Sequence, residues 1–311
     1  MIIQSSNMTS SALRRYETHT RQGRSFSPPL ESTTKSSNAS NSNSVQTSDI
    51  QKLRQETLDY LLNLLFGRRY MKSEREYSFT AMADGEQSTA SNIGYFYEEQ
   101  EMIHFETTGT AITADGRELS FQLDLSMSRS YMEISGDNIQ FNQPYVCDPL
   151  VINLNGSGTT VTDQKFLFDI DGDGNEESIS QLGAGNGYLA LDQNEDGIIN
   201  NGNELFGTKS GNGFKDLAVY DKDQNGWIDE ADEIFQKLKV WTVDENGVST
   251  LLSLKEAGVG AIYLGAKDTP FSLTNSQNEV NAIIRQTGMF LFESGRPGTI
   301  QQVDMAISNI S

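Results

Sequence analysis

Apolar residues recur at helical spacing in one segment near the start of the chain. Between residues 48 and 67 they lie three or four positions apart, Ser48 is placed to cap the first turn, and Gly67 is placed to end the last. The pattern predicts an amphipathic helix over 48–67. Its apolar face would pack either on the rest of the chain or on a partner protein, and both alternatives stay open at this point.

Residues 98–134 have the pattern of one long hairpin, and apolar and polar residues alternate strictly in its second half. The apolar members of its second half are Leu119, Phe121, Leu123, Leu125 and Met127. A period of two predicts strands with one buried face, and Asp115-Gly116 supplies a tight turn between them. We therefore expect a long antiparallel hairpin within a β region that spans residues 73–147.

Residues 1–47 show neither period. They are rich in serine and asparagine and hold almost no large apolar side chains, so little burial would offset the entropy lost on ordering them. This composition predicts a disordered tail. The first residues lack the basic stretch and apolar core of a cleaved export signal, and no apolar run approaches the ~18 residues of a membrane helix. We expect no membrane insertion, and a protein that is cytoplasmic or exported without a cleaved signal.

Charge and composition exclude several classes of function. The 311-residue chain has a formal net charge of −20, with a net +5 in residues 1–72 and a net −25 in residues 73–311. Such an acidic body repels phosphate backbones and anionic lipids, so we expect no nucleic-acid partner. One cysteine, Cys147, and two histidines cannot build a cysteine-rich zinc site or a histidine cluster, which makes zinc chemistry and histidine-based triads improbable.

The chemistry is concentrated in three acidic loops within about sixty residues. Each loop repeats an acidic or amide residue at alternate positions before a glycine. Calcium is a hard cation that takes about 6 to 8 oxygen ligands, and side chains at loop positions 1, 3 and 5 converge on it when a glycine at position 6 allows a sharp turn. The pattern predicts two to three bound Ca²⁺ ions.

The third loop has the fullest set of ligands. They are Asp221, Asp223, Asn225, the carbonyl of Trp227, Asp229 and Asp232. Helical periodicity on both sides, over 214–220 and 231–238, predicts a helix–loop–helix unit. The aspartate at position 12 is one methylene shorter than the usual glutamate, which would lower the preference for calcium over magnesium.

The second loop follows the same spacing. Its candidate ligands are Asp192, Asn194, Asp196, the carbonyl of Ile198, Asn200 and Glu204. The last ligand is either Asn203 at position 12 or Glu204 at position 13, and we favour Glu204. Ile199 and Ile228 both occupy position 8 of their loops, which predicts that loops two and three join as an EF-hand pair.

The first loop lacks a carboxylate at position 12, where Ser180 stands, and Glu177 at position 9 is its substitute. Its candidate ligands are Asp169, Asp171, Asp173, Asn175 and Glu177. The flanking segments look like strands, so we expect a calcium-binding β-hairpin of the DxDxDG type. The predicted fold class is thus α+β, mainly antiparallel β with an EF-hand pair, with residues 148–311 as the calcium-binding domain.

These loops carry a resemblance. The segment from Leu191 to Gly207 reads LDQNEDGIINNGNELFG, and GF..LAVYDKDQNGWIDE follows from Gly213. Together with KVW at Lys239, they resemble the calcium-binding modules of RTX-type bacterial proteins over 148–264, most closely the self-processing module of these proteins and a group of bacterial EF-hand proteins.

The resemblance implies a reaction as well as an ion. In the self-processing module, calcium triggers cleavage of an Asp-Pro bond at the N-terminal edge, and the new aspartyl end is joined to a lysine. Asp148-Pro149 stands at that edge and is the only Asp-Pro in the chain. Two hypotheses follow: a non-enzymatic, calcium-ordered structural or interaction module with an unidentified protein partner, or self-processing with Asp148 and Pro149 as the reacting residues.

Overall fold

The computed structural model describes residues 1–25, 92–135, 145–244 and 246–307. Their secondary structure is mainly antiparallel β, in sheets of three, nine and two strands. No helix among these described residues is long and apolar enough to cross a membrane. The expected helix over 48–67 lies outside the described residues, as do 73–91 and 136–144 of the expected β region.

The three-stranded sheet has the order β1-β2-β3. Its strands are β1 (Ile3–Ser25), β2 (Asn92–Thr113) and β3 (Glu118–Ser135). Strands β2 and β3 form the expected hairpin, in register from Tyr95 opposite Ser135 to Ile112 opposite Glu118. Its alternation is also as expected, since Phe121, Leu123 and Leu125 are buried.

Strand β1 corrects the prediction of a disordered tail over 1–47. Residues 3–25 are a strand, whereas 26–47 lie outside the described residues. A segment rich in serine and threonine can form a strand when a neighbouring hairpin provides backbone partners for it. The composition of residues 1–47 contains no information about this neighbouring hairpin. The mean polarity of the segment is also high although one residue, Ile3, is only 1% exposed and anchors the strand in the core.

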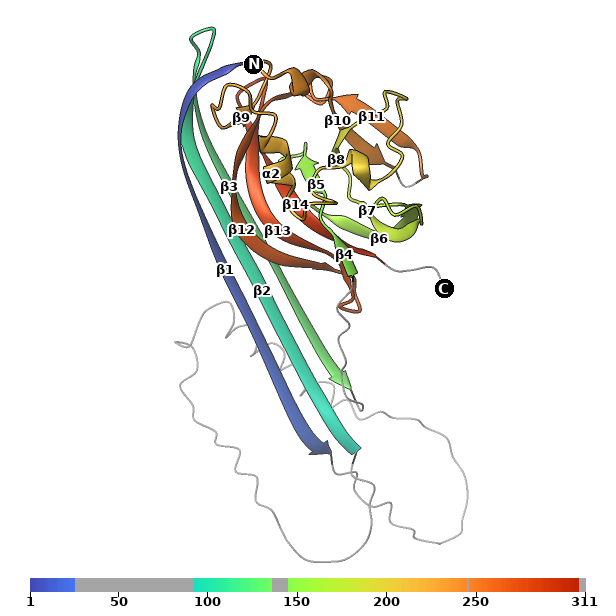
Figure 1. The fold of residues 1–311 in the computed structure, drawn as a ribbon. Helices are drawn as coiled ribbons and strands as arrows, with labels where there is room; N and C mark the ends of the chain where they lie inside the picture. Colours follow the sequence, from blue (N-terminus) through green and yellow to red (C-terminus); the bar gives the residue numbers. More distant parts are fainter. Residues whose placement is uncertain (26–91, 136–144, 245, 308–311) are drawn as a thin grey trace, which may run out of the picture. The chain divides into compact units, whose positions relative to one another are not determined.

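The nine-stranded sheet has the order β11-β10-β8-β5-β14-β13-β12-β9, and β4 pairs with β14 beside β5 (Figure 1). Its strands are β4 (Tyr145–Cys147), β5 (Leu150–Asn153), β8 (Asn186–Leu191), β9 (Trp227–Ile228), β10 (Leu238–Val243), β11 (Ser249–Ser253), β12 (Val259–Thr274), β13 (Val280–Phe292) and β14 (Pro297–Ile307). The two-stranded sheet consists of β6 (Val161–Phe168) and β7 (Glu177–Leu182).

Helical structure is sparse in the described residues. It is limited to α2 (Gly213–Ala218) and two 3-10 turns, η1 (Gly202–Glu204) and η2 (Glu233–Gln236). The expected EF-hand pair with full flanking helices is therefore not formed. The apolar residues after loop three, which we interpreted as one helical face, are divided between η2 and the start of β10, where Leu238 is buried.

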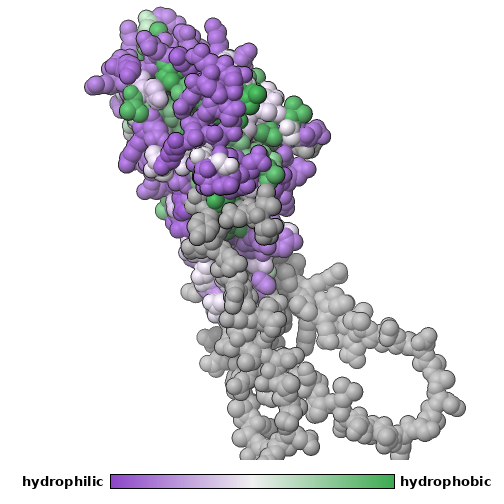
Figure 2. Space-filling model, turned by 45° about the vertical axis from the view of Figure 1, so that its right-hand side comes forward, coloured by the Kyte–Doolittle hydropathy of each residue, from purple (hydrophilic) through white to green (hydrophobic). Residues whose placement is uncertain are grey.

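Three apolar clusters hold the described fold together. One packs β6, β7 and loop residues on one face of the nine-stranded sheet, and a second packs α2 and η2 with strands of the same sheet. The third joins residues of β1, β2 and β3 to Trp227, Ala261 and Leu291. Trp227 and Trp241 are both core residues. Hydrophilic side chains cover most of the face in Figure 2.

Candidate metal centre

The three acidic loops have the same backbone conformation. Position 4 of each loop is left-handed, with φ of 72° at Gly172 and 58° at both Glu195 and Gln224. The glycine at position 6 is left-handed as well, with φ of 95° at Gly174 and 82° at both Gly197 and Gly226. In each loop this glycine donates its N–H to the position 1 carboxylate, over 3.1, 2.8 and 3.0 Å respectively. The repeated spacing in the sequence thus corresponds to one repeated turn.

Loop one connects β6 and β7, which form the expected hairpin. Single carboxylate oxygens of Asp169, Asp171 and Glu177 lie within 4.8 Å of one another, a group that could hold a metal ion. Glu177 is buried, and its Oε2 accepts a hydrogen bond from Ile170 N at 3.1 Å. Asp173 lies outside this group, and its Oδ1 accepts from Asn175 N at 2.7 Å.

Loop two lies between β8 and η1. Glu204 is 6% exposed and its carboxylate accepts from Gln193 N at 3.0 Å and Asn200 N at 2.7 Å, so it turns onto the loop. Asp192 and Asp196 also have their oxygens directed at loop N–H groups. Asn194 Nδ2 donates to Asn200 Oδ1 at 2.8 Å, and the Ile198 side chain is exposed.

Loop three brings together carboxylate oxygens of Asp221, Asp223 and Asp232 within 4.8 Å, a second group that could hold a metal ion. Asp232 is 1% exposed, and despite its short side chain it belongs to this group. Asp229 is not in this group, and its two oxygens accept hydrogen bonds from Ile3 N at 2.7 Å and Ala231 N at 2.8 Å.

The expected pairing of loops two and three is wrong. Ile228 pairs with Ile262 of β12, whereas Ile199 packs in a different cluster with Phe168 and Ile170. Loop two instead adjoins loop one: Gly202 N donates to Asp169 O at 2.8 Å, and a Cβ on Gly202 would lie 1.7 Å from the oxygen of Ile170. The position 8 pattern failed because both isoleucines are simply core residues of separate layers.

The start of the chain contacts loop three, which the sequence did not predict. Besides the bond from Ile3 N to Asp229, Asn225 Nδ2 donates to Ile3 O at 3.0 Å and Trp227 Nε1 donates to Ser6 Oγ at 2.9 Å. The amino group of Met1 lies 2.6 Å from Glu230 Oε2. Two expected ligands, Asn225 and Asp229, therefore also hold β1.

A comparison with known families identifies the domain that contains these loops. The model of the SPM domain matches residues 150–306, half of the chain. The chain belongs to the SPM domain family. It is also 31% identical over 182 residues to the iron-regulated protein FrpA of Neisseria meningitidis serogroup C, a match that covers 53% of this chain. The chain spans 16% of the length of that relative.

The Asp148-Pro149 bond lies immediately before the matched SPM domain. Pro149 is buried and Asp148 is partly buried. The chain is held on both sides of the bond: before it, Cys147 pairs with Met305 of β14, and after it, Val303 N of β14 donates to Pro149 O at 3.0 Å. The neighbouring Cys147 is buried, and burial raises the pKa of its thiol, which makes it a poor nucleophile.

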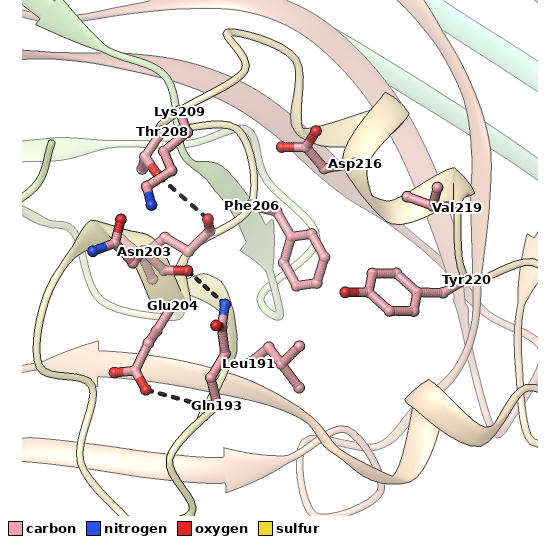
Figure 3. A pocket seen from close by; sticks show the side chains of 11 residues that line it. Leu191, Gln193, Asn203, Glu204, Phe206, Thr208, Lys209, Asp216, Val219 and Tyr220 are labelled. Atoms are coloured by element: carbon pink, nitrogen blue, oxygen red, sulfur yellow. Dashed lines mark hydrogen bonds between the residues drawn. The ribbon is translucent and has the colours of Figure 1, made fainter. Parts of the chain in front are cut away.

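A pocket of about 260 Å³ adjoins loop two within the SPM domain (Figure 3). Its walls combine Phe206 and Tyr220 with Glu204, Lys209 and Asp216. Glu204 is bonded to Gln193 in the same wall, and Asp216 accepts from Gly207 N at 3.1 Å. The polar groups of Glu204 and Asp216 are therefore used in hydrogen bonds that hold loop two and the segment before α2.

Proposed function

We propose that the chain is a calcium-binding module, in which the three loops hold two to three Ca²⁺ ions. The observation that carries this proposal is the shared turn, in which positions 4 and 6 are left-handed and the glycine N–H orients the first carboxylate in all three loops. In loops one and three, the carboxylates at positions 1 and 3 lie together with a later carboxylate, Glu177 or Asp232, and calcium binds to such oxygen clusters.

The donor set favours a hard cation. Each of the two clusters of three carboxylates that could hold an ion offers oxygen ligands only. Oxygen ligands bind calcium or magnesium in preference to the softer transition metals. Burial and the charges of Asp171, Asp173 and Asp169 raise the pKa of Glu177. A cation among these carboxylates would reverse this repulsion.

The role that fits is structural rather than enzymatic. Loop one joins two strands, loop two adjoins loop one, and loop three contacts the start of β1. Binding of ions at these places would order the contacts between them, and the ordered surface would serve an unidentified protein partner.

Calorimetry with calcium tests the proposal. The full chain should bind two to three ions per molecule after chelator is removed, and Asp169→Asn combined with Asp221→Asn should lower the number of ions bound. Asp124→Asn, on the exposed face of β3, is the matched control and should bind as the unaltered chain does. Absence of calcium binding in the unaltered chain would refute the proposal.

A second candidate function is self-processing at Asp148-Pro149. The observation that favours it is that pairing with β14 holds the chain both before and after the bond, at Cys147 and at Pro149. Attack of the Asp148 carboxylate on its own carbonyl carbon would form a five-membered anhydride and release Pro149, a step that proximity favours.

Mass spectrometry after incubation with calcium at neutral pH tests this second function. Fragments 1–148 and 149–311 should appear with calcium, and should be absent with chelator and in Asp148→Asn. An intact mass after prolonged incubation would eliminate self-processing and leave the calcium-binding proposal unaffected.

A further inference from the structure

The residue opposite the Asp148-Pro149 bond is set by the strand register. Strands β4 and β5 both pair with β14, with Cys147 opposite Met305 and Leu150 opposite Gln302. Residues 148 and 149 interrupt this ladder and lie across from residues 304 and 303. The side chain of Asp304 is thereby brought to the reacting bond from a strand that is more than 150 positions later in the chain.

Asp304 is a buried carboxyl in contact with another carboxyl. It is 2% exposed, its neighbour Asp148 raises its pKa, and Arg285 Nε donates to its Oδ2. Its Oδ1 is buried, and no N–H or hydroxyl among the described residues donates to it. Two neighbouring carboxyls repel each other when both are ionised, so burial and this neighbour favour a proton on Asp304 beside the bond.

The charged groups that face Asp304 are Asp148 and Arg285. Burial and contact with Asp148 raise the pKa of Asp304 to about 7, against the lowering effect of Arg285. A carboxylic acid that titrates near neutral pH is suited to proton transfer under physiological conditions.

The carbonyl of the same bond is also enclosed. A Cβ placed on Gly207 would lie 2.1 Å from Asp148 O, so the Gly207 backbone packs directly against this carbonyl. A Cβ on Gly211 would lie 3.4 Å from Asp148 Oδ2. The Asp148 main chain and side chain are therefore both confined by the loop that follows η1, while Asp304 lies on the β14 side.

We infer that Asp304 is a catalytic residue of cleavage at Asp148-Pro149, a role that rests on the proposed self-processing. Asp148, as carboxylate, attacks its own carbonyl carbon and forms the C–O bond of the anhydride. The C–N bond to Pro149 breaks, its electron pair goes to nitrogen, and Asp304 gives its proton to that nitrogen. Water then opens the anhydride and two protons are released, of which one returns to Asp304 and the other protonates the Pro149 amine.

The rate at which the full chain is cleaved in the presence of calcium, measured by mass spectrometry over about pH 5 to 9, tests this role. The rate should fall as pH rises through about 7, where Asp304 loses its proton. Asp304→Asn should slow cleavage by about 100-fold or more and abolish that fall in rate, because general acids contribute about 10²- to 10⁴-fold. Asp304→Glu should restore part of the rate, and Asp124→Asn should match the unaltered chain.

A second measurement is independent of cleavage. NMR titration of the carboxyl carbons in calcium should show Asp304 titrating near neutral pH, and Asp148→Asn should lower that midpoint. Calcium calorimetry on Asp304→Asn should match the unaltered chain, which shows that the loops still fold.

The outcomes separate the two proposals. Cleavage by Asp304→Asn at the unaltered rate and with the unaltered pH profile would overturn the role of Asp304 and leave self-processing in place. A midpoint for Asp304 in the ordinary range near pH 4 would overturn it as well. An unaltered chain that is never cleaved would refute self-processing and the role of Asp304 together.

Discussion

The first aspartates of the three loops differ in how their oxygens are used. Both oxygens of Asp169 accept loop N–H groups, from Asp173 and Gly174, and both oxygens of Asp192 are used in the same way. Asp221 uses only Oδ2, and its Oδ1 is buried with no donor among the described residues. A buried carboxylate oxygen without a donor is costly unless a cation contacts it.

Asp221→Asn should therefore weaken calcium binding more than Asp169→Asn. We expect the dissociation constant of the affected site to rise by more than about tenfold, since even an indirect partner of a bound metal contributes about 10- to 100-fold. Calorimetry of each variant gives the comparison, with Asp124→Asn as the control of equal charge change. A larger loss in Asp169→Asn would contradict the order.

For single residues, the sequence predicted the local turns of the loops but not the contacts with residues far away in the chain. Spacing alone predicted which residue of each loop is a left-handed glycine, because that conformation depends on neighbours within six positions. It did not predict that the oxygens of Asp229 accept the N–H groups of Ile3 and Ala231. The first of these contacts crosses 226 positions and has no signal in the loop itself.

Among the elements, β1 depends on a few residues at its start. Ile3 is 1% exposed and packs with Phe105, Trp227 and Leu291, whereas the adjacent Ile2 is 37% exposed. Ile2 lies just before β1 and has the same side chain in an exposed position, so the two isoleucines form a matched pair.

Ile3→Ala should lower the free energy of unfolding by about 2 to 5 kcal/mol, the usual range for a buried isoleucine replaced by alanine. Ile2→Ala, with the same chemical change on the exposed face, should alter it by less than about 0.5 kcal/mol. Urea denaturation measures both. Equal effects of the two substitutions would show that the start of β1 does not dock against loop three.

The contact between loops one and two predicts coupling between their ions. The hydrogen bond from Gly202 N to Asp169 O connects the position 1 residue of loop one with η1. The 3-10 turn η1 is also where loop two ends. Substitutions in Asp169 and Asp192 should then be non-additive by about 0.5 kcal/mol or more in calcium binding, as is usual for residues in one network.

A double-mutant cycle by calorimetry decides this point. Asp169→Asn with Asp192→Asn is the test pair, and Asp169→Asn with Asp221→Asn is the control pair, which should be additive because loop three packs in other clusters. Coupling in the control pair but not in the test pair would contradict the prediction that the contact between loops one and two links their ions.

For the described molecule as a whole, a buried ionic network joins the three-stranded sheet to the nine-stranded one. Arg129 of β3 pairs with Glu99 and, at 3.0 Å, with Glu101. Glu101 Oε2 accepts from Ser272 N of β12 at 3.0 Å, and Asn278, which follows β12, bonds to both Arg129 and Glu99. The hairpin pattern predicted β2 and β3. The burial of charged residues on one face of this hairpin was not predictable from the pattern, because their partners lie in and after β12.

This network makes stability depend on pH. Burial opposes ionisation of Glu99, but hydrogen bonds from Tyr97 and Asn278 and the charge of Arg129 outweigh it and lower its pKa. The contribution of Glu99 should be fully present above its unfolded pKa, which is about 4.3 for an ordinary glutamate, and be lost as pH falls through the lower folded value.

Glu99→Gln should consequently reduce the free energy of unfolding at pH 7, where it leaves Arg129 without one of its partners. The difference from the unaltered chain should shrink as pH falls below about 4, because Glu99 is then protonated as well. Urea denaturation across this range measures the difference, and Glu118→Gln, exposed at the turn end of the same hairpin, should show none. A difference that stays constant down to the acid limit would mean that packing of Glu99, rather than its charge, joins the two sheets.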